Sequence, residues 1–159
     1  MFTGALAASF YGRARTTRDI DVVVAVVGRD WKSKLVSALK RAGLVVEEEK
    51  IDEALRSGYK IATFKNGKSP LMVDIIFSDT KLEKKAGKIL GMPTFYQKPE
   101  DLVLAKLRMI KATKPRERAL KDEEDVRAIL KFTRVDLDEL KRRARKENTL
   151  SIFEALMAE

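Results

Sequence analysis

The chain has 159 residues and a formal net charge of +9, with 33 lysines and arginines against 24 acidic residues. It contains no cysteine and no histidine, which excludes disulfides, cysteine nucleophiles, histidine bases and the usual zinc sites. Any metal must therefore be held by oxygen ligands, which magnesium, manganese and calcium prefer. The excess of basic residues favours a polyanionic ligand such as a nucleotide or RNA, although ion pairs on a solvated surface account for it equally well.

The length and the hydropathy pattern predict one globular unit, because a chain of this size can bury a core of its own. No apolar run reaches the length of about 18 residues that a membrane span needs, and the first residues do not resemble a signal peptide. We therefore expect a cytoplasmic protein that makes no contact with a membrane.

The first half of the chain predicts a sheet with flanking helices. Small apolar residues predict a short helix at Gly4–Tyr11. The β-branched run 19–27 predicts a central strand that is buried on both faces. Further elements are expected as a helix over 30–41, a short strand over 44–48, a helical turn over 52–57, and two antiparallel strands over 59–65 and 71–77.

The second half predicts mainly helices. A charged surface helix is expected over 79–88, followed by an irregular segment over 91–98. Four more helices are expected over 99–111, 117–132, 136–146 and 151–157. The fold class is therefore α/β (α+β), with a mixed β-sheet and flanking helices in a domain over 1–97 and a C-terminal helical subdomain over 98–159.

Three aspartates are the candidate site. Side chains alternate between the faces of a strand, so Asp19 and Asp21 point the same way, about 6.5–7 Å apart along the backbone. Asp74 lies in the apolar run MVDII (72–76) of another predicted strand. Such carboxylates are costly to desolvate unless a cation or hydrogen-bond donors compensate them.

Three carboxylates without a histidine are typical ligands for one or two hard divalent cations, which support phosphoryl or nucleotidyl transfer. A structural alternative remains open for each residue. Asp19 would then cap a turn, Asp21 would pair with a nearby arginine, and Asp74 would be a charge on an edge strand.

The motifs Gly4-Ala5, DIDV (19–22) and VDI (73–75) resemble the signature of the DNA polymerase β-like nucleotidyltransferase superfamily. More narrowly, three runs resemble the AbiEii-type nucleotidyltransferases of toxin–antitoxin systems: YGRARTTRDID (11–21), KPEDL (98–102) and KDEEDV (121–126). The resemblance covers about residues 4 to 130. It implies a nucleotidyltransferase-type sheet and a C-terminal helical bundle.

The resemblance implies roles for the motif residues. Asp19, Asp21 and Asp74 would be the catalytic, metal-binding carboxylates, and Gly4 and Ala5 would offer backbone N–H groups to the β- and γ-phosphates. The chain departs from the family pattern in two ways. Ala5 replaces the usual glycine or serine, and the first strand of the fold is truncated or absent, being reduced to residues 1–3.

Basic residues are candidate nucleotide ligands. Arg15, and after it Arg13, lie between the glycine turn and the aspartates and could meet a triphosphate, or could pair with surface acids instead. Lys106 lies on the apolar side of a predicted helix, where it either reaches the nucleotide, as the resemblance implies, or extends its ammonium to solvent. Asp122 and Asp125 are interpreted as structural carboxylates that hold Arg118 or Lys106.

The predicted function is Mg²⁺- or Mn²⁺-dependent transfer of a nucleoside monophosphate from a nucleoside triphosphate to an acceptor hydroxyl, with release of pyrophosphate. The family implies as acceptor a tRNA or other RNA end, or a hydroxyl on a partner protein such as an antitoxin. Homo-oligomers are compatible with the sequence. The alternative is a catalytically inactive binding module of the same fold, in a toxin–antitoxin or RNA-binding role.

Overall fold

A computed structural model describes residues 1–158, apart from the side chains of Arg116 and Arg118. The chain divides into two compact units. The sheet unit comprises Met1–Thr3 and Thr16–Tyr96, and the helical unit comprises Gly4–Arg15 and the chain from Gln97 onward. The N-terminal helix therefore groups with the C-terminal helices, whereas the sequence-based division assigns all of 1–97 to one domain.

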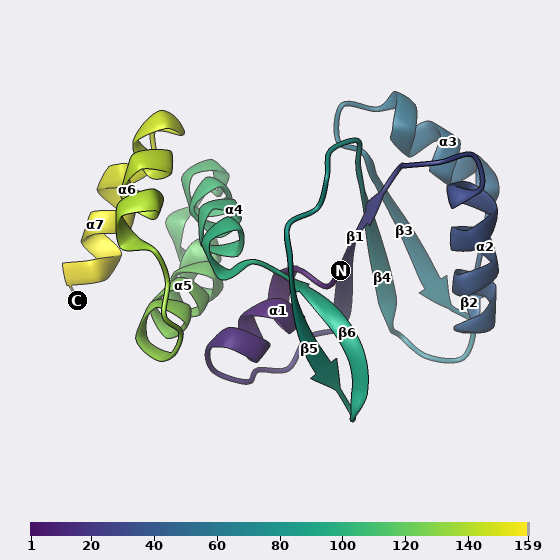
Figure 1. Cartoon of the computed structure of the whole chain (residues 1–159), viewed down its shortest axis with the longest axis horizontal. Helices are drawn as coiled ribbons and strands as arrows, with labels where there is room; N and C mark the ends of the chain where they lie inside the picture. The colour runs from purple at the N-terminus through teal and green to yellow at the C-terminus, as the bar shows by residue number, and fades with distance from the viewer. Residues whose placement is uncertain (159) are drawn as a thin grey trace. The chain divides into compact units, whose positions relative to one another are not determined.

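The sheet unit is built on a four-stranded sheet with the order β1-β4-β3-β2 (Figure 1). β1 runs parallel to β4, and the other neighbours are antiparallel. Helices α2 and α3 lie on one face of this sheet (Figure 1). The elements span β1 Asp19–Ala25, α2 Trp31–Arg41, β2 Leu44–Val45, α3 Glu48–Arg56, β3 Ile61–Asn66 and β4 Met72–Ser78.

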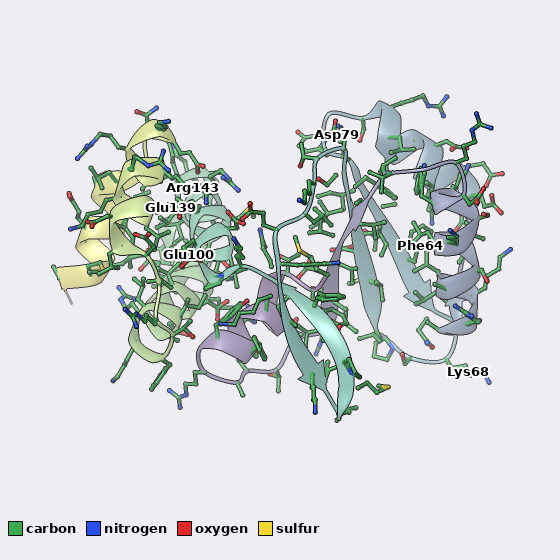
Figure 2. The ribbon with its side chains drawn as sticks, in the orientation of Figure 1. Phe64, Lys68, Asp79, Glu100, Glu139 and Arg143 are labelled. Carbon is green, nitrogen blue, oxygen red and sulfur yellow. The ribbon has the colours of Figure 1, made fainter. Side chains whose placement is uncertain are left out.

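The core of this unit follows from strand alternation. Every second residue of β3 and β4 is buried, and these residues pack against α2 and α3. Phe64, which is 1% exposed, points from β3 into the layer between the sheet and the helices (Figure 2). The antiparallel pair predicted over 59–65 and 71–77 is thus confirmed as β3 and β4.

The prediction that β1 is a central strand is wrong. β1 is the last of the four strands and is half-buried along its whole length. Its outer edge is paired with residues 1–3, since Thr3 N–H donates to Asp21 O at 3.0 Å and Val23 N–H donates to Met1 O at 2.8 Å. The short segment 1–3 therefore satisfies backbone groups that an edge strand would otherwise expose.

The helix predicted over 79–88 is also wrong. The chain instead forms a two-stranded hairpin of β5 Lys84–Ile89 and β6 Met92–Gln97. Leu90 and Gly91, between the strands, both have positive φ (48° and 79°), which is the backbone of a type I′ hairpin turn. The charged residues suggested a surface helix, but a two-residue turn of this kind selects a hairpin.

The helical unit contains six helical elements among its described residues: α1 Gly4–Tyr11, α4 Pro99–Ala112, the 3₁₀ turn η1 Arg116–Ala119, α5 Leu120–Phe132, α6 Leu137–Lys146 and α7 Leu150–Ala158. The helices predicted at these places are confirmed to within a few residues. The predicted helix over 117–132 begins as the 3₁₀ turn η1. In the described part of the chain, no helix is both long enough and apolar enough to cross a membrane.

Ion pairs connect helices within this unit. Arg143 on α6 donates to Asp101 on α4 at 2.6 Å and to Glu139, one turn earlier on α6, at 3.2 Å. Figure 2 labels Arg143 and Glu139 next to each other on α6. Burial by itself would lower the pKa of Arg143, but its bonds to Asp101 and Glu139 raise that pKa overall.

Helix α1 packs against α4 and α5, and Gly12, directly after α1, lies against α5. A Cβ atom placed on Gly12 would lie 2.9 Å from Ala128 Cβ and 3.0 Å from Ala128 C. The first distance is shorter than carbon–carbon contacts permit, and the second is tighter than most of them. Glycine at this position thus lets the end of α1 touch the backbone of α5.

We expect Gly12→Ala to lower the free energy of unfolding by about 1–3 kcal/mol, because the added methyl group must displace the α5 backbone. Urea denaturation followed by circular dichroism measures the change. Gly58→Ala is the matched control, because no atom of the described residues lies within 4 Å of its added Cβ. Equal stabilities of the two variants would contradict close packing at Gly12.

Candidate active site

The candidate carboxylates of the sheet unit are brought together by strand pairing. In the parallel register of β1 with β4, Asp21 lies directly opposite Asp74, and Asp19 lies opposite Met72. Directly paired residues point to the same face, and neighbouring strands are about 4.8 Å apart. Asp19, Asp21 and Asp74 therefore share one face of the sheet.

The opposite face of the same strands is apolar. Ile20 and Val22 of β1, with Val73 and Ile75 of β4, pack into the core beneath α2 and α3. The alternation therefore directs the carboxylates away from the core, to the face that α2 and α3 do not cover. Once β1 and β4 are known to pair, the alternation of acidic and apolar residues in their sequences is enough to predict this arrangement.

Thr63 is a residue of this face that sequence reasoning missed. It lies opposite Asp74 in the antiparallel register of β3 with β4, and its hydroxyl donates to Asp74 Oδ1 at 2.6 Å. This bond orients the Asp74 carboxylate. The sequence could have indicated Thr63 through the pairing register of the two antiparallel strands. Once that register is known, the Thr63 hydroxyl lies beside Asp74.

Asp19 is positioned by backbone contacts at the start of β1. Its N–H donates to Thr17 Oγ1 at 3.3 Å, and Thr17 Oγ1 donates to Asp19 O at 3.0 Å. Among the described residues, the buried atom Asp19 Oδ1 has no hydrogen-bond partner. A buried carboxylate oxygen without a donor is costly, and a cation would compensate it.

These oxygens fit a hard divalent cation by their chemistry, since all three candidates are carboxylates on one face. As the described side chains stand, however, no three acidic residues are close enough to form a ready metal-ligand cluster. The argument that these residues could bind a metal ion therefore depends on three observations: their shared face, the pairing of Asp21 with Asp74, and the Asp19 oxygen that has no partner among the described residues.

The predicted phosphate-binding turn is the start of α1. Gly4 has φ +56°, a left-handed conformation that residues with a Cβ rarely adopt. Ala5 is buried in the first turn of the helix. The N–H groups of a first helical turn lack partners within the helix, which makes them suitable donors for an anion.

The basic candidates of the helical unit differ from one another. Arg13 is exposed, whereas Arg15 and Lys106 both bind Asp125. Arg15 Nε and Nη2 each lie 3.0 Å from an Asp125 oxygen, and Lys106 Nζ lies 2.7 Å from Asp125 Oδ2. Lys106 also donates to Asp122 at 2.8 Å.

This group of four charged residues, Arg15, Lys106, Asp122 and Asp125, is called the Asp125 cluster and links the chain just after α1 with α4 and α5. Lys106 and Asp125 are both 5% exposed, so their charges are almost fully removed from water. Asp122 and Asp125 hold Lys106, which is one of the two partners that sequence reasoning proposed for them. The other, Arg118, has a side chain outside the described set.

We expect Asp125→Asn to lower the free energy of unfolding by about 3 kcal/mol, because it removes the charge that compensates the buried Lys106. Asp122→Asn should cost less, since the Asp122 side chain is 26% exposed and water screens its charge. Urea denaturation of both variants at neutral pH measures the difference. A smaller loss for Asp125→Asn than for Asp122→Asn would contradict the central place of Asp125.

Comparison with known proteins supports the fold. No protein-family model matches the chain, and no curated protein matches it closely enough to count as a relative. Among solved structures, the chain is similar to an antigenic nucleotidyltransferase-like protein from Paracoccidioides brasiliensis, with a TM-score of 0.60 and 14% sequence identity. The match covers 99% of this chain and 84% of that one. The chain therefore has a nucleotidyltransferase-like fold.

Proposed function

We propose that the protein is a metal-dependent nucleotidyltransferase that moves a nucleoside monophosphate from a nucleoside triphosphate to an acceptor hydroxyl. One observation carries the proposal. Asp21 lies in register with Asp74, and Asp19 shares their face with one buried oxygen unsatisfied among the described residues. The nucleotidyltransferase-like fold of the solved neighbour is consistent with this chemistry.

In the proposed reaction, the acceptor oxygen forms a bond to the α-phosphorus. The bond between that phosphorus and the oxygen that bridges it to the β-phosphorus breaks. Pyrophosphate leaves with the electron pair, and the hydroxyl proton passes to a carboxylate, for which we propose Asp74. Asp19, Asp21 and Asp74 would hold Mg²⁺ or Mn²⁺. When bound, such an ion neutralises charge on the phosphates and lowers the pKa of the attacking hydroxyl.

Thr63 supports this role of Asp74. Because its hydroxyl already donates to Asp74 Oδ1, the carboxylate is held in one orientation relative to the sheet. A fixed carboxylate loses less conformational entropy when the substrate binds. Thr63 is therefore proposed as a positioning residue for Asp74.

We further propose that the triphosphate is bound by backbone N–H groups of Gly4 and Ala5 and by Arg13, Arg15 and Lys106. For Arg15 and Lys106, a phosphate would have to compete with Asp125. Arg13 is exposed, so a phosphate that binds Arg13 meets less competition from a carboxylate of the protein. The proposed acceptors are an RNA end, such as that of tRNA, and a hydroxyl of a partner protein such as an antitoxin, by the resemblance to AbiEii-type enzymes.

A second candidate is a binding module that retains the fold without transfer. The Asp125 cluster favours it, because two of the proposed nucleotide ligands are already neutralised. So does the lack of a ready three-carboxylate cluster among the described side chains. Nucleotide binding without transfer would identify this alternative.

Mg²⁺ together with a nucleoside triphosphate should raise the melting temperature by about 5 °C or more at a hundredfold excess over Kd, because the ligand binds only the folded state. Asp21→Asn should abolish this rise. Asp30→Asn is the matched control, because Asp30 is an exposed carboxylate whose side chain makes no cap bond. Differential scanning fluorimetry measures both variants, and an equal rise in both would contradict the assigned metal ligands.

Transfer itself is tested with α-labelled ATP, GTP, CTP and UTP offered with Mn²⁺ or Mg²⁺ to total tRNA and to a cell lysate. We expect label in an RNA or protein band. Asp19→Ala should lower the rate by about a hundredfold or more, which is about 2.7 kcal/mol of transition-state stabilisation. Asp30→Ala should keep it. Binding of a triphosphate with no transfer to any acceptor would favour the binding module instead.

A further inference from the structure

A basic groove lies on the sheet unit, away from the carboxylates. It has a volume of about 590 Å³ and is lined by residues of α2, by Arg29 just before α2, and by the start of α3. Because α2 packs on the apolar face of the sheet, the groove lies on the side opposite to Asp19, Asp21 and Asp74. The lining residues are Arg29, Lys32, Ser33, Val36, Ser37, Lys40, Arg41 and Glu48.

The lining follows one stripe of the helix. Apart from Glu48, its residues recur at intervals of three and four, which is the spacing of one helical face. From Arg29 to Arg41 this stripe extends about 18 Å at 1.5 Å per residue. The groove therefore presents a row of groups along a line and not a single point of convergence.

The charge of this row is strongly positive. Four lining residues are basic and one, Glu48, is acidic. Lys32 is already paired with Asp52 of α3 at 2.6 Å. Within the described part of the chain, Arg29, Lys40 and Arg41 take part in no ion pair. Among the described residues, three cations of the groove thus have no ion-pair partner.

We propose that this groove, the α2 groove, binds the phosphodiester backbone of a double-helical nucleic acid. Spaced cations with a hydroxyl donor between them, here Ser37, are the groups that contact phosphates without reading bases, whereas the Ser33 hydroxyl already donates to Asp30 O at 3.0 Å. None of the described residues that line the groove is aromatic, whereas single strands are held largely by stacking on aromatic rings. A duplex, whose bases are already stacked, fits the lining better.

The lining also disfavours a protein partner. Among the described lining residues, Val36 alone has an apolar side chain, whereas protein interfaces centre on apolar and aromatic residues in a desolvated core. A free nucleotide fits poorly too, because a base needs an apolar or aromatic surface to pack on. The chemistry of the groove is therefore that of a sequence-independent duplex contact, and it does not depend on nucleotidyl transfer.

Fluorescence anisotropy tests the proposal with RNA and DNA duplexes of the same sequence and about 20 base pairs, between about 50 and 200 mM salt. The solution holds EDTA and no nucleoside triphosphate, so failure of the proposed transfer activity leaves the result unaffected. Binding of either duplex supports the proposal, and the preferred duplex identifies the source of the backbone. Binding of neither would overturn it.

The groove is tested by the triple variant Arg29→Ala, Lys40→Ala, Arg41→Ala. Its affinity should fall by about tenfold or more, and the slope of log K against log salt should flatten by about 2–3, because three phosphate contacts are lost. The matched control is Lys34→Ala, Lys68→Ala, Lys85→Ala, which removes the same charge from exposed positions of the sheet unit.

The control separates the groove from general attraction to a basic protein. An equal loss of affinity in the two triple variants would overturn the proposal, because net charge alone would then explain binding. Equal binding of a polyglutamate chain and of the duplexes would overturn it in favour of an acidic protein partner. The six positions are exposed, and circular dichroism confirms that each variant is folded before it is compared.

Discussion

The parallel pairing of β1 with β4 is the constraint on which the sheet unit depends. Its register places Asp21 beside Asp74 and sends Ile20, Val22, Val73 and Ile75 to the other face. A shift by one residue would exchange the faces, burying carboxylates under α2 and α3 and exposing the apolar side chains. The cost of burying an uncompensated charge therefore selects the register, and the register creates the candidate active site.

The helical unit has a corresponding constraint in the Asp125 cluster. Arg15 comes from the chain just after α1, Lys106 from α4, and Asp125 from α5, so one carboxylate connects three segments that are far apart in the sequence. Such a buried group is stable only when every charge has its partner. It also means that Arg15 and Lys106, both candidate nucleotide ligands, have a structural role in the helical unit.

Positive charge is distributed unequally between these features. In the Asp125 cluster, carboxylates offset the cations, whereas Arg29, Lys40 and Arg41 of the α2 groove have no ion-pair partner among the described residues. Ion pairs on a solvated surface therefore do not account for all of the basic residues behind the net charge of +9. The candidate carboxylates and the cations Arg29, Lys40 and Arg41 of the α2 groove lie on opposite sides of the sheet, so metal chemistry and duplex binding, as proposed, would not compete for one surface.

The sequence by itself determined the helix Gly4–Tyr11 and the shared face of Asp19 and Asp21, because each depends only on the period of a single segment. It also determined the pair β3 and β4, because these two strands are neighbours in the chain. The tertiary structure decided the edge position of β1, the β5–β6 hairpin in place of a helix, and the burial of Lys106 against Asp125. These outcomes depend on which distant segments meet. Side-chain periodicity shows which way a residue points, but only long-range packing chooses its partner.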